Sequence, residues 1–271
     1  MSFVIIGSIL YAIPICFIRR FHTPLNLLTL SLSVALFMCT TFWTIYFVMN
    51  TFYTNRLWTE KSCLVIIYLQ TIVNGQFVNT LCSISLNRLF AIVYPNKAFF
   101  RTKTWVAICM CIQLIYGLLI PLPQFASNIT HCLLTGLEIG YQIYVLVINA
   151  IIPLVFLTII NSIIFISVRR STRRVHNTNS EHQESANTLN QRDARLLKHM
   201  LFMLITFLGG WIPMYIIAVI DWNGDGISYI ALHTWWILPM LSFIINMCDL
   251  FMYNHELRSY ITTKLRNRPS R

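Results

Sequence analysis

The sequence predicts an all-α membrane protein, a seven-transmembrane helix bundle with a short amphipathic helix at its C-terminus. Of its 271 residues, 56% are hydrophobic and only 11% are charged, whereas soluble domains carry about 25% charged residues. Seven apolar runs approach or exceed the roughly 20 residues that a helix needs to cross a bilayer. The predicted spans are residues 2–18, 25–48, 63–94, 103–122, 141–168, 192–220 and 227–253.

The positive charges predict the orientation of these spans. All Lys and Arg residues except Arg56 and Lys61 fall into four groups on alternating sides of the apolar runs. Basic loops stay on the cytoplasmic side of a membrane. We therefore expect a multi-pass plasma-membrane protein with an extracellular N-terminus and a cytoplasmic C-terminus. The basic groups are residues 19–20, 88–103, 169–198 and 258–271. Because these charges mark one face of the membrane, the net charge of +11 does not indicate a nucleic-acid partner.

The first span is the shortest. A helix from Met1 to Ile18 rises about 27 Å, barely enough for a hydrocarbon core ~30 Å thick. Either this helix is thin on its outer side, or the sequence lacks its true beginning. A cleaved signal peptide is disfavoured because the basic pair Arg19–Arg20 follows the apolar run instead of preceding it.

Residues 168–191 and 254–271 are polar and basic. The first segment predicts a flexible loop whose ends contact lipid headgroups or, in addition, an anionic partner protein. In the second segment, apolar residues recur at helical spacing among Arg and Lys, which predicts a helix lying on the membrane surface. These apolar residues are Leu257, Tyr260, Ile261 and Leu265.

Two of the eight cysteines fall on the side assigned to the exterior. These are Cys63 and Cys132, and because that side is oxidising, we expect them to form a disulfide. The alternative is two unpaired thiols. The loop before Cys132 also contains Asn128-Ile129-Thr130, an acceptor sequence for N-glycosylation at Asn128.

Three stretches carry a family resemblance. The third span ends in Asn87-Arg88-Leu89 followed by Ala91-Ile92-Val93-Tyr94-Pro95, and the sixth contains Phe207-Leu208-Gly209-Gly210-Trp211-Ile212-Pro213. These stretches resemble the Asp-Arg-Tyr box with its trailing Ala-Ile-x-x-Pro, and the Phe-x-x-Cys-Trp-x-Pro motif, of rhodopsin-like (class A) G-protein-coupled receptors. The fifth span carries the proline of that family at Pro153. Asn246-Met247-Cys248-Asp249-Leu250 occupies the place of Asn-Pro-x-x-Tyr, so the chain resembles a divergent orphan member.

The resemblance implies a receptor that binds an extracellular ligand and activates a heterotrimeric G protein, with no enzymatic activity and no cofactor. Trp211 on the proline-kinked sixth helix would report the ligand, although a membrane tryptophan can also be an interface anchor. Asp249 is either functional or a hydrated residue at the helix exit. The implied switch residues are Asn87, Arg88, Asp193, Asn246 and Asp249, and the implied transmission residues are Phe207, Trp211, Pro213 and Pro153.

The candidate ligand-pocket residues lie at similar depth on three spans. Gln70 stands where aminergic receptors carry an aspartate, so we expect a peptide or another polar, non-amine ligand. The seventh span has no lysine for a retinal Schiff base. For Asn74 and His233 the alternative role is ordinary hydrogen bonding between helices. The candidates are Gln70, Thr71, Asn74, Trp211, Tyr215, His233 and Trp236.

We expect no metal site. In many members of the family an acid of the second helix is the main sodium ligand, and Leu36 occupies that position here. The neighbouring ligand positions look to be replaced by Phe77 and Phe243. A hard cation needs oxygen ligands, which none of these side chains offers.

Two other functions stay open. A seven-helix protein that binds a ligand or dimerises without coupling to a G protein would fit the altered motifs. A transporter or channel would normally show internal repeats or several charges inside the membrane, and Asp249 is the only charge well inside a span.

The sequence predicts that Asp193→Ala raises ligand-free signalling. Asn87 cannot act as a charged partner for Arg88, so we expect Asp193, at the foot of the sixth helix, to hold Arg88 at rest. Basal G-protein activation, compared at equal surface expression, measures this. Unchanged basal activity would mean that the two residues do not form the proposed pair.

Overall fold

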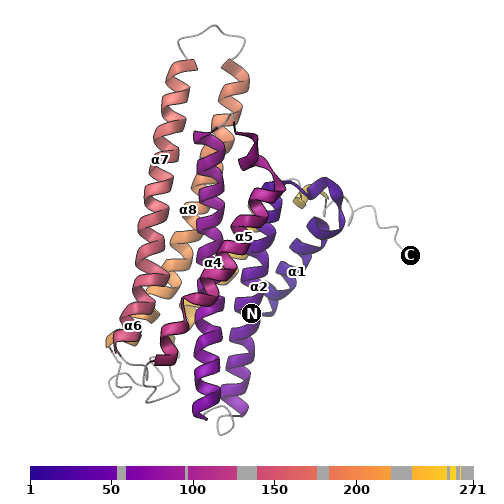
Figure 1. Ribbon diagram of the computed structural model, residues 1–271. Helices are drawn as coiled ribbons and strands as arrows, with labels where there is room; N and C mark the ends of the chain where they lie inside the picture. The colour runs from indigo at the N-terminus through magenta and orange to yellow at the C-terminus, as the bar shows by residue number, and fades with distance from the viewer. Residues whose placement is uncertain are drawn as a thin grey trace, which may run out of the picture.

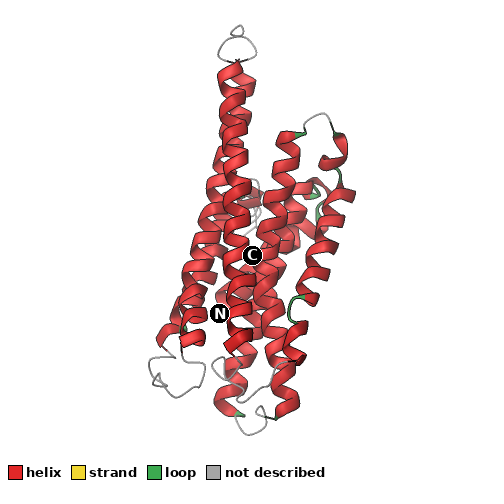
Figure 2. Ribbon diagram, turned by 60° about the vertical axis from the view of Figure 1, so that its left-hand side comes forward, coloured by secondary structure: helices red, strands yellow, loops and turns green. Residues whose placement is uncertain are grey.

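The computed structural model describes residues 1–53, 59–94, 97–126, 139–175, 183–220, 234–254, 257–260 and 263, without side chains at 60, 61, 101, 168–175 and 183–197. Within these ranges the regular structure is entirely helical. The long helices stand side by side as one bundle (Figures 1 and 2). They are α1 (Ser2–Phe17), α2 (Pro24–Phe52), α4 (Glu60–Val93), α5 (Lys103–Leu119), α6 (Ile139–Leu146), α7 (Ile152–Val175), α8 (Gln183–Ile220) and α10 (Ile237–Tyr253). Short turns connect or extend them: η1 (Arg19–Phe21), η2 (Ala98–Arg101), η3 (Leu122–Ala126) and the π-helical η4 (Val147–Ile151).

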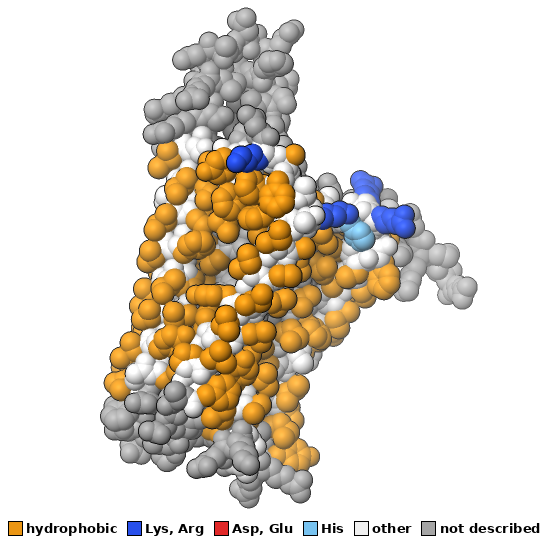
Figure 3. All heavy atoms as spheres, viewed as in Figure 1, with side chains coloured by type: hydrophobic (Ala, Val, Ile, Leu, Met, Phe, Trp, Pro, Cys, Tyr) orange, Lys and Arg blue, Asp and Glu red, His pale blue; other side chains and the backbone are white. Residues whose placement is uncertain are grey.

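The described part of the chain contains seven apolar helical segments. Five are long and apolar enough to cross a membrane: Pro24–Phe52, Ser62–Val93, Lys103–Phe125, Ile139–Ser167 and Lys198–Ile220. Two shorter apolar helices, Ser2–Phe17 and Ile237–Tyr253, complete the set. On the face shown in Figure 3, hydrophobic side chains cover the middle of the molecule, and the described Lys and Arg side chains gather toward one end. We call this the basic end, and the opposite end, where α4 begins, the Cys63 end.

Helix α1 covers only part of the bundle's height. Figure 1 shows the N-terminus near mid-height, whereas α2 and α4 continue farther toward the Cys63 end. Its inward face is nevertheless tightly packed, because Val4, Tyr11 and Ile15 are fully buried. The hydroxyl of Ser33 on α2 also donates to the Ser8 carbonyl, at 3.2 Å. The short first span is therefore anchored to α2 along its whole described length.

Helices α7 and α8 extend past the basic end. We expected a flexible loop over residues 168–191, but α7 continues to Val175 and α8 already begins at Gln183. Hydropathy identifies the part of a helix that is inside the bilayer, and it does not report a polar continuation into water. Figures 1 and 2 show this pair of helices rising beyond the others.

Threonine side chains begin three of the helices. The hydroxyls of Thr23, Thr59 and Thr102 accept hydrogen bonds from backbone N–H groups three residues later, at 3.2–3.3 Å. Such caps satisfy a donor that would otherwise be unpaired and contribute about 1 kcal/mol each. Sequence thus fixes where α2, α4 and α5 start.

The amide of Gln113 joins three helices in the membrane interior. Its Nε2 donates to the hydroxyl of Ser31 on α2, at 2.8 Å, and lies 3.2 Å from that of Thr80 on α4. An amide therefore connects α5 to its neighbours at this level.

The C-terminal segment packs against the basic end. Asn254 accepts from the Leu257 N–H at 3.2 Å and donates to the Tyr11 hydroxyl at 3.1 Å. Leu257 is fully buried, and the Tyr260 ring meets Phe21 edge to face at 5.7 Å. This turn of helix, residues 257–260, places the first half of the predicted apolar stripe against the bundle. The other half, Ile261 and Leu265, lies outside the described residues.

Helices α8 and α10 approach closely at Gly210. A Cβ atom there would lie 2.7 Å from the Ser242 Cβ, 2.8 Å from its Oγ and 3.1 Å from the Leu238 carbonyl oxygen. At the adjacent Gly209, nothing lies within 4 Å of such an atom. A side chain at position 210 would therefore push the two helices apart.

We expect Gly210→Ala to destabilise the bundle and Gly209→Ala, its matched control, to be tolerated. Forcing a methyl group into a packed contact costs about 1–3 kcal/mol. The measurement is the apparent melting temperature of the two purified variants beside the wild type. Equal melting temperatures for both variants would contradict the close packing of α8 on α10.

Candidate functional site

Three tryptophans from different helices meet inside the half of the bundle nearer the Cys63 end. Trp211 on α8 is 1% exposed, and its ring centroid lies 5.5 Å from that of Trp43 on α2 and 6.3 Å from that of Trp236. Trp43 and Trp236 are only 4.4 Å apart. A ring buried to this degree does not face lipid, which removes the interface-anchor interpretation of Trp211. We call these three residues the tryptophan cluster.

Asn74 holds the tryptophan cluster in place. Its Oδ1 accepts from the Trp43 indole N–H at 3.0 Å and from the Cys39 thiol at 3.3 Å. This oxygen therefore bonds α4 to α2, the interhelical role we left open from the sequence. Sequence reasoning missed Trp43; the available signal was a second tryptophan in the middle of an apolar span.

The remaining pocket candidates lie around the cluster. Tyr215 is buried one turn from Trp211, with the two rings 6.1 Å apart. Thr71 donates to the Ile67 carbonyl at 3.0 Å and lies 3.5 Å from the Tyr141 hydroxyl of α6. Gln70 is also buried, at 9% exposure. His233 lies outside the described residues.

Asn149 is a further polar residue that sequence reasoning missed. It is 3% exposed and lies on the π-helical turn η4, where its Oδ1 is 3.2 Å from the point that a Gly75 Cβ would occupy. Its Nδ2 has no hydrogen-bond partner within the described part of the chain, and the same is true of the Trp211 indole nitrogen. The signal was an asparagine inside the apolar run 145–151. Both groups are buried N–H donors that lack an acceptor among the described residues.

Pro153 explains why the helix widens at Asn149. Proline has no N–H, and its ring crowds the carbonyl four residues earlier, which belongs to Asn149. A π-helical turn relieves this crowding and is frequent at functional sites. The predicted transmission proline therefore acts by shaping the turn that carries Asn149.

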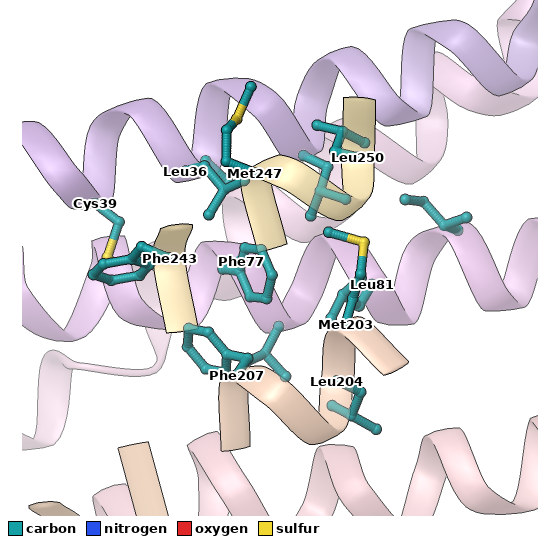
Figure 4. Close-up of a cluster of buried hydrophobic side chains, with 14 of the residues drawn as sticks. Leu36, Cys39, Phe77, Leu81, Met203, Leu204, Phe207, Phe243, Met247 and Leu250 are labelled. Atoms are coloured by element: carbon teal, nitrogen blue, oxygen red, sulfur yellow. The ribbon is translucent and has the colours of Figure 1, made fainter. Parts of the chain in front are cut away.

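A hydrophobic layer adjoins the tryptophan cluster, because Trp211 contacts Phe207 and Phe243. Figure 4 shows the side chains of this layer. Leu36, Phe77 and Phe243, the positions expected to lack sodium ligands, are all fully buried. The Phe77 ring stacks on Phe207 of α8, with centroids 4.5 Å apart. Aliphatic and aromatic side chains thus fill this level.

Asn246 lies on α10, three residues after Phe243 of that layer. It is fully buried, and neither its Oδ1 nor its Nδ2 has a hydrogen-bond partner among the residues that the structure describes. Buried polar atoms are usually paired. The surroundings of Asn246 therefore differ from those expected for the asparagine of the Asn-Pro-x-x-Tyr motif. One such difference is Leu36, which stands where the family carries an acid on the second helix.

At the basic end, Asp249 contacts a histidine that the sequence did not single out. Its Oδ2 lies 2.6 Å from the Nδ1 of His199 on α8. The His199 ring stacks on Tyr253, with centroids 4.1 Å apart and planes within 7°. Asp249 is therefore not simply a hydrated residue at a helix exit. The signal was one histidine and one acid near the inner ends of adjacent spans.

The predicted Arg88–Asp193 pair is only half described. Arg88 is partly exposed at the end of α4 and Asn87 beside it is 7% exposed. The side chain of Asp193 is not described, so their pairing stays a prediction. Pro213 lies inside α8, two residues after Trp211.

Cys63 is disulfide-bonded and 1% exposed. Its predicted partner Cys132 and the acceptor Asn128 lie outside the described residues, so both of those assignments stay predictions. The other six cysteines among the described residues are free thiols.

These features define a multi-pass helical membrane protein with a buried aromatic centre and polar contacts at one end. The chain belongs to the 7 transmembrane receptor (rhodopsin family), whose profile matches residues 7–253. It is therefore a member of the rhodopsin-like G-protein-coupled receptors, a family of receptors and not of enzymes. The resemblance noted in the sequence and the predicted fold class are confirmed.

Individual relatives agree with this assignment. The chain is 25% identical over 243 residues to "Trace amine-associated receptor 6" of Pan troglodytes, covering 80% of this chain and 68% of the relative. The Homo sapiens receptor of the same name gives the same values. Squid rhodopsin superposes with a TM-score of 0.76 at 15% identity, over 97% of this chain and 81% of that one.

We expect sodium to have no effect on ligand affinity or on stability. The positions of Leu36, Phe77 and Phe243 offer no oxygen, and a cation bound only by the native state would stabilise it in proportion to its concentration. Replacing sodium by N-methylglucamine should leave the melting temperature of the purified receptor and its agonist affinity unchanged. A clear shift in either would contradict this expectation.

Proposed function

We propose that this receptor binds an extracellular ligand beside the tryptophan cluster and activates a heterotrimeric G protein at its basic end. The observation that carries the proposal is a continuous series of ring contacts. Trp211 lies 6.0 Å from Phe207, and Phe207 stacks on Phe77 at 4.5 Å. Phe77 is eleven residues, about 16 Å of helix, above Arg88 on the same α4. A ligand that moves Trp211 would therefore displace α8 against the helix that carries Arg88.

The orientation follows from the charges. The basic end faces the cytoplasm of the plasma membrane, and the Cys63 end faces the oxidising exterior. The N-terminus is then extracellular and the C-terminus cytoplasmic. This places the tryptophan cluster toward the ligand's side.

The ligand is a peptide or another polar molecule that is not an amine. The relatives are named for trace amines, but Gln70 stands where aminergic receptors carry a carboxylate. Neutral Gln70 cannot pair with an ammonium group as a charge. The unpaired donors of Asn149 and Trp211 instead suit a ligand with acceptor oxygens.

A seven-helix protein that binds ligand or dimerises without G-protein coupling is the second candidate. The unpaired amide of Asn246 and the replacement of the motif's proline and tyrosine by Met247 and Leu250 favour it. A transporter is the weaker alternative. The one acid well inside a span, Asp249, is engaged with His199 and not part of a series of charges.

Arg88→Gln and Lys97→Gln separate these functions. Both variants remove one positive charge from the basic end, but only Arg88 terminates the proposed series of contacts. We expect Arg88→Gln to reduce nucleotide exchange on purified G protein at least tenfold, measured in the Asp193→Ala background so that no ligand is required. Lys97→Gln should leave the exchange rate within twofold. If the Asp193→Ala protein and the two double variants made from it exchange nucleotide at equal rates, coupling through Arg88 is excluded.

A further inference from the structure

The basic end contains a buried contact between α8 and α10 that the proposed function does not use. The Nδ1 of His199 and the Oδ2 of Asp249 are 2.6 Å apart, and the two side chains are 6% and 22% exposed. The Tyr253 ring stacks on the imidazole. The histidine is thus packed between the Tyr253 ring on one face and the Asp249 carboxylate at its Nδ1.

The contact is short and largely removed from water, since only 6% and 22% of the two side chains are exposed. Polar groups interact more strongly where little water surrounds them. Separating the two atoms would leave an imidazole nitrogen and a carboxylate oxygen partly buried without each other, which is costly.

The contact lies at the end of a lever. Gly210 of α8 packs directly on Ser242 and Leu238 of α10, and His199 is eleven residues, about 16 Å, farther along the same helix. A tilt of α8 by about 10° around Gly210 would move its lower part by roughly 3 Å at that lever length. This displacement separates Nδ1 from Oδ2 while the upper contact stays intact.

We propose that His199 and Asp249 form a latch between α8 and α10 that keeps the basic end closed until a ligand tilts α8. The proposal rests on the proposed function, because it regulates the same helix. It is separate from the Arg88–Asp193 pair, which would join α8 to α4. α10 is one continuous helix from Ile237 to Tyr253, so Asp249 is held rigidly opposite His199.

Graded substitutions test the latch. His199→Phe keeps a ring to stack on Tyr253 but removes the imidazole nitrogens, and Asp249→Ala removes the carboxylate. Asp249→Asn keeps a neutral acceptor. We expect basal nucleotide exchange to rise at least threefold for His199→Phe and Asp249→Ala, and by less for Asp249→Asn. Cys248→Ser, on an exposed neighbour of Asp249, is the control that should not change it.

The substitutions break the contact between His199 and Asp249, whereas a covalent cross-link at the same two positions would hold it closed. In a Cys248→Ser background, the double variant His199→Cys, Asp249→Cys should form a disulfide under mild oxidation. The cross-linked receptor should then lose basal exchange, and reductant should restore it. Exchange that is equally high with and without the cross-link would overturn the latch.

The latch and the coupling can fail separately. Exchange that depends on Arg88 but is unchanged in His199→Phe and Asp249→Ala overturns the latch alone. If no variant stimulates nucleotide exchange, the proposed coupling to a G protein is wrong. The latch is then tested by the distance between spin labels at the basic ends of α8 and α10. A wider distance in His199→Phe than in the wild type supports the latch, and an equal distance overturns it.

Discussion

The stacking of Phe77 on Phe207 is the contact on which the proposed transmission through the bundle depends. It joins α4 to α8 between the tryptophan cluster and the basic end, at a centroid distance of 4.5 Å. Both rings are buried within a layer that also contains Leu36 and Phe243 (Figure 4). Densely packed side chains transmit displacement because they cannot be compressed. Trp211 is thus connected to α4 through these two rings, and also through Trp43 and Asn74.

The apolar layer also determines which polar groups remain available. With Leu36 in place of an acid, Asn246 has no partner among the described residues. Unpaired buried amides are costly, and their cost is the same in two packings of the helices only if both leave them unpaired. A packing that gives Asn246 an acceptor would gain stability.

The sequence predicted where the helices lie along the chain, but it did not predict how each helix is rotated about its own axis relative to its neighbours. Hydropathy located the spans because a bilayer requires every crossing segment to be a long apolar helix. It could not show which face of each helix points inward, since lipid and protein core both accept apolar side chains. The pairing of Trp43 with Asn74, the inward position of Asn149 and the contact of His199 with Asp249 all depend on that rotation. Motif resemblance located Trp211 and Arg88, whose spacing along single helices needs no knowledge of the neighbours.

The polar contacts at the basic end therefore set the balance between closed and open packings. Contacts in the apolar layer are weakly directional, so sliding one ring past another exchanges similar contacts and changes the energy little. The contact between the His199 imidazole and the Asp249 carboxylate is short, and a displacement of a few ångströms would abolish it. Two packings of one bundle that differ by a few kcal/mol can be reversed by a ligand with a comparable difference in affinity. In the latch proposed for this chain, that difference depends on the contact of His199 on α8 with Asp249 on α10.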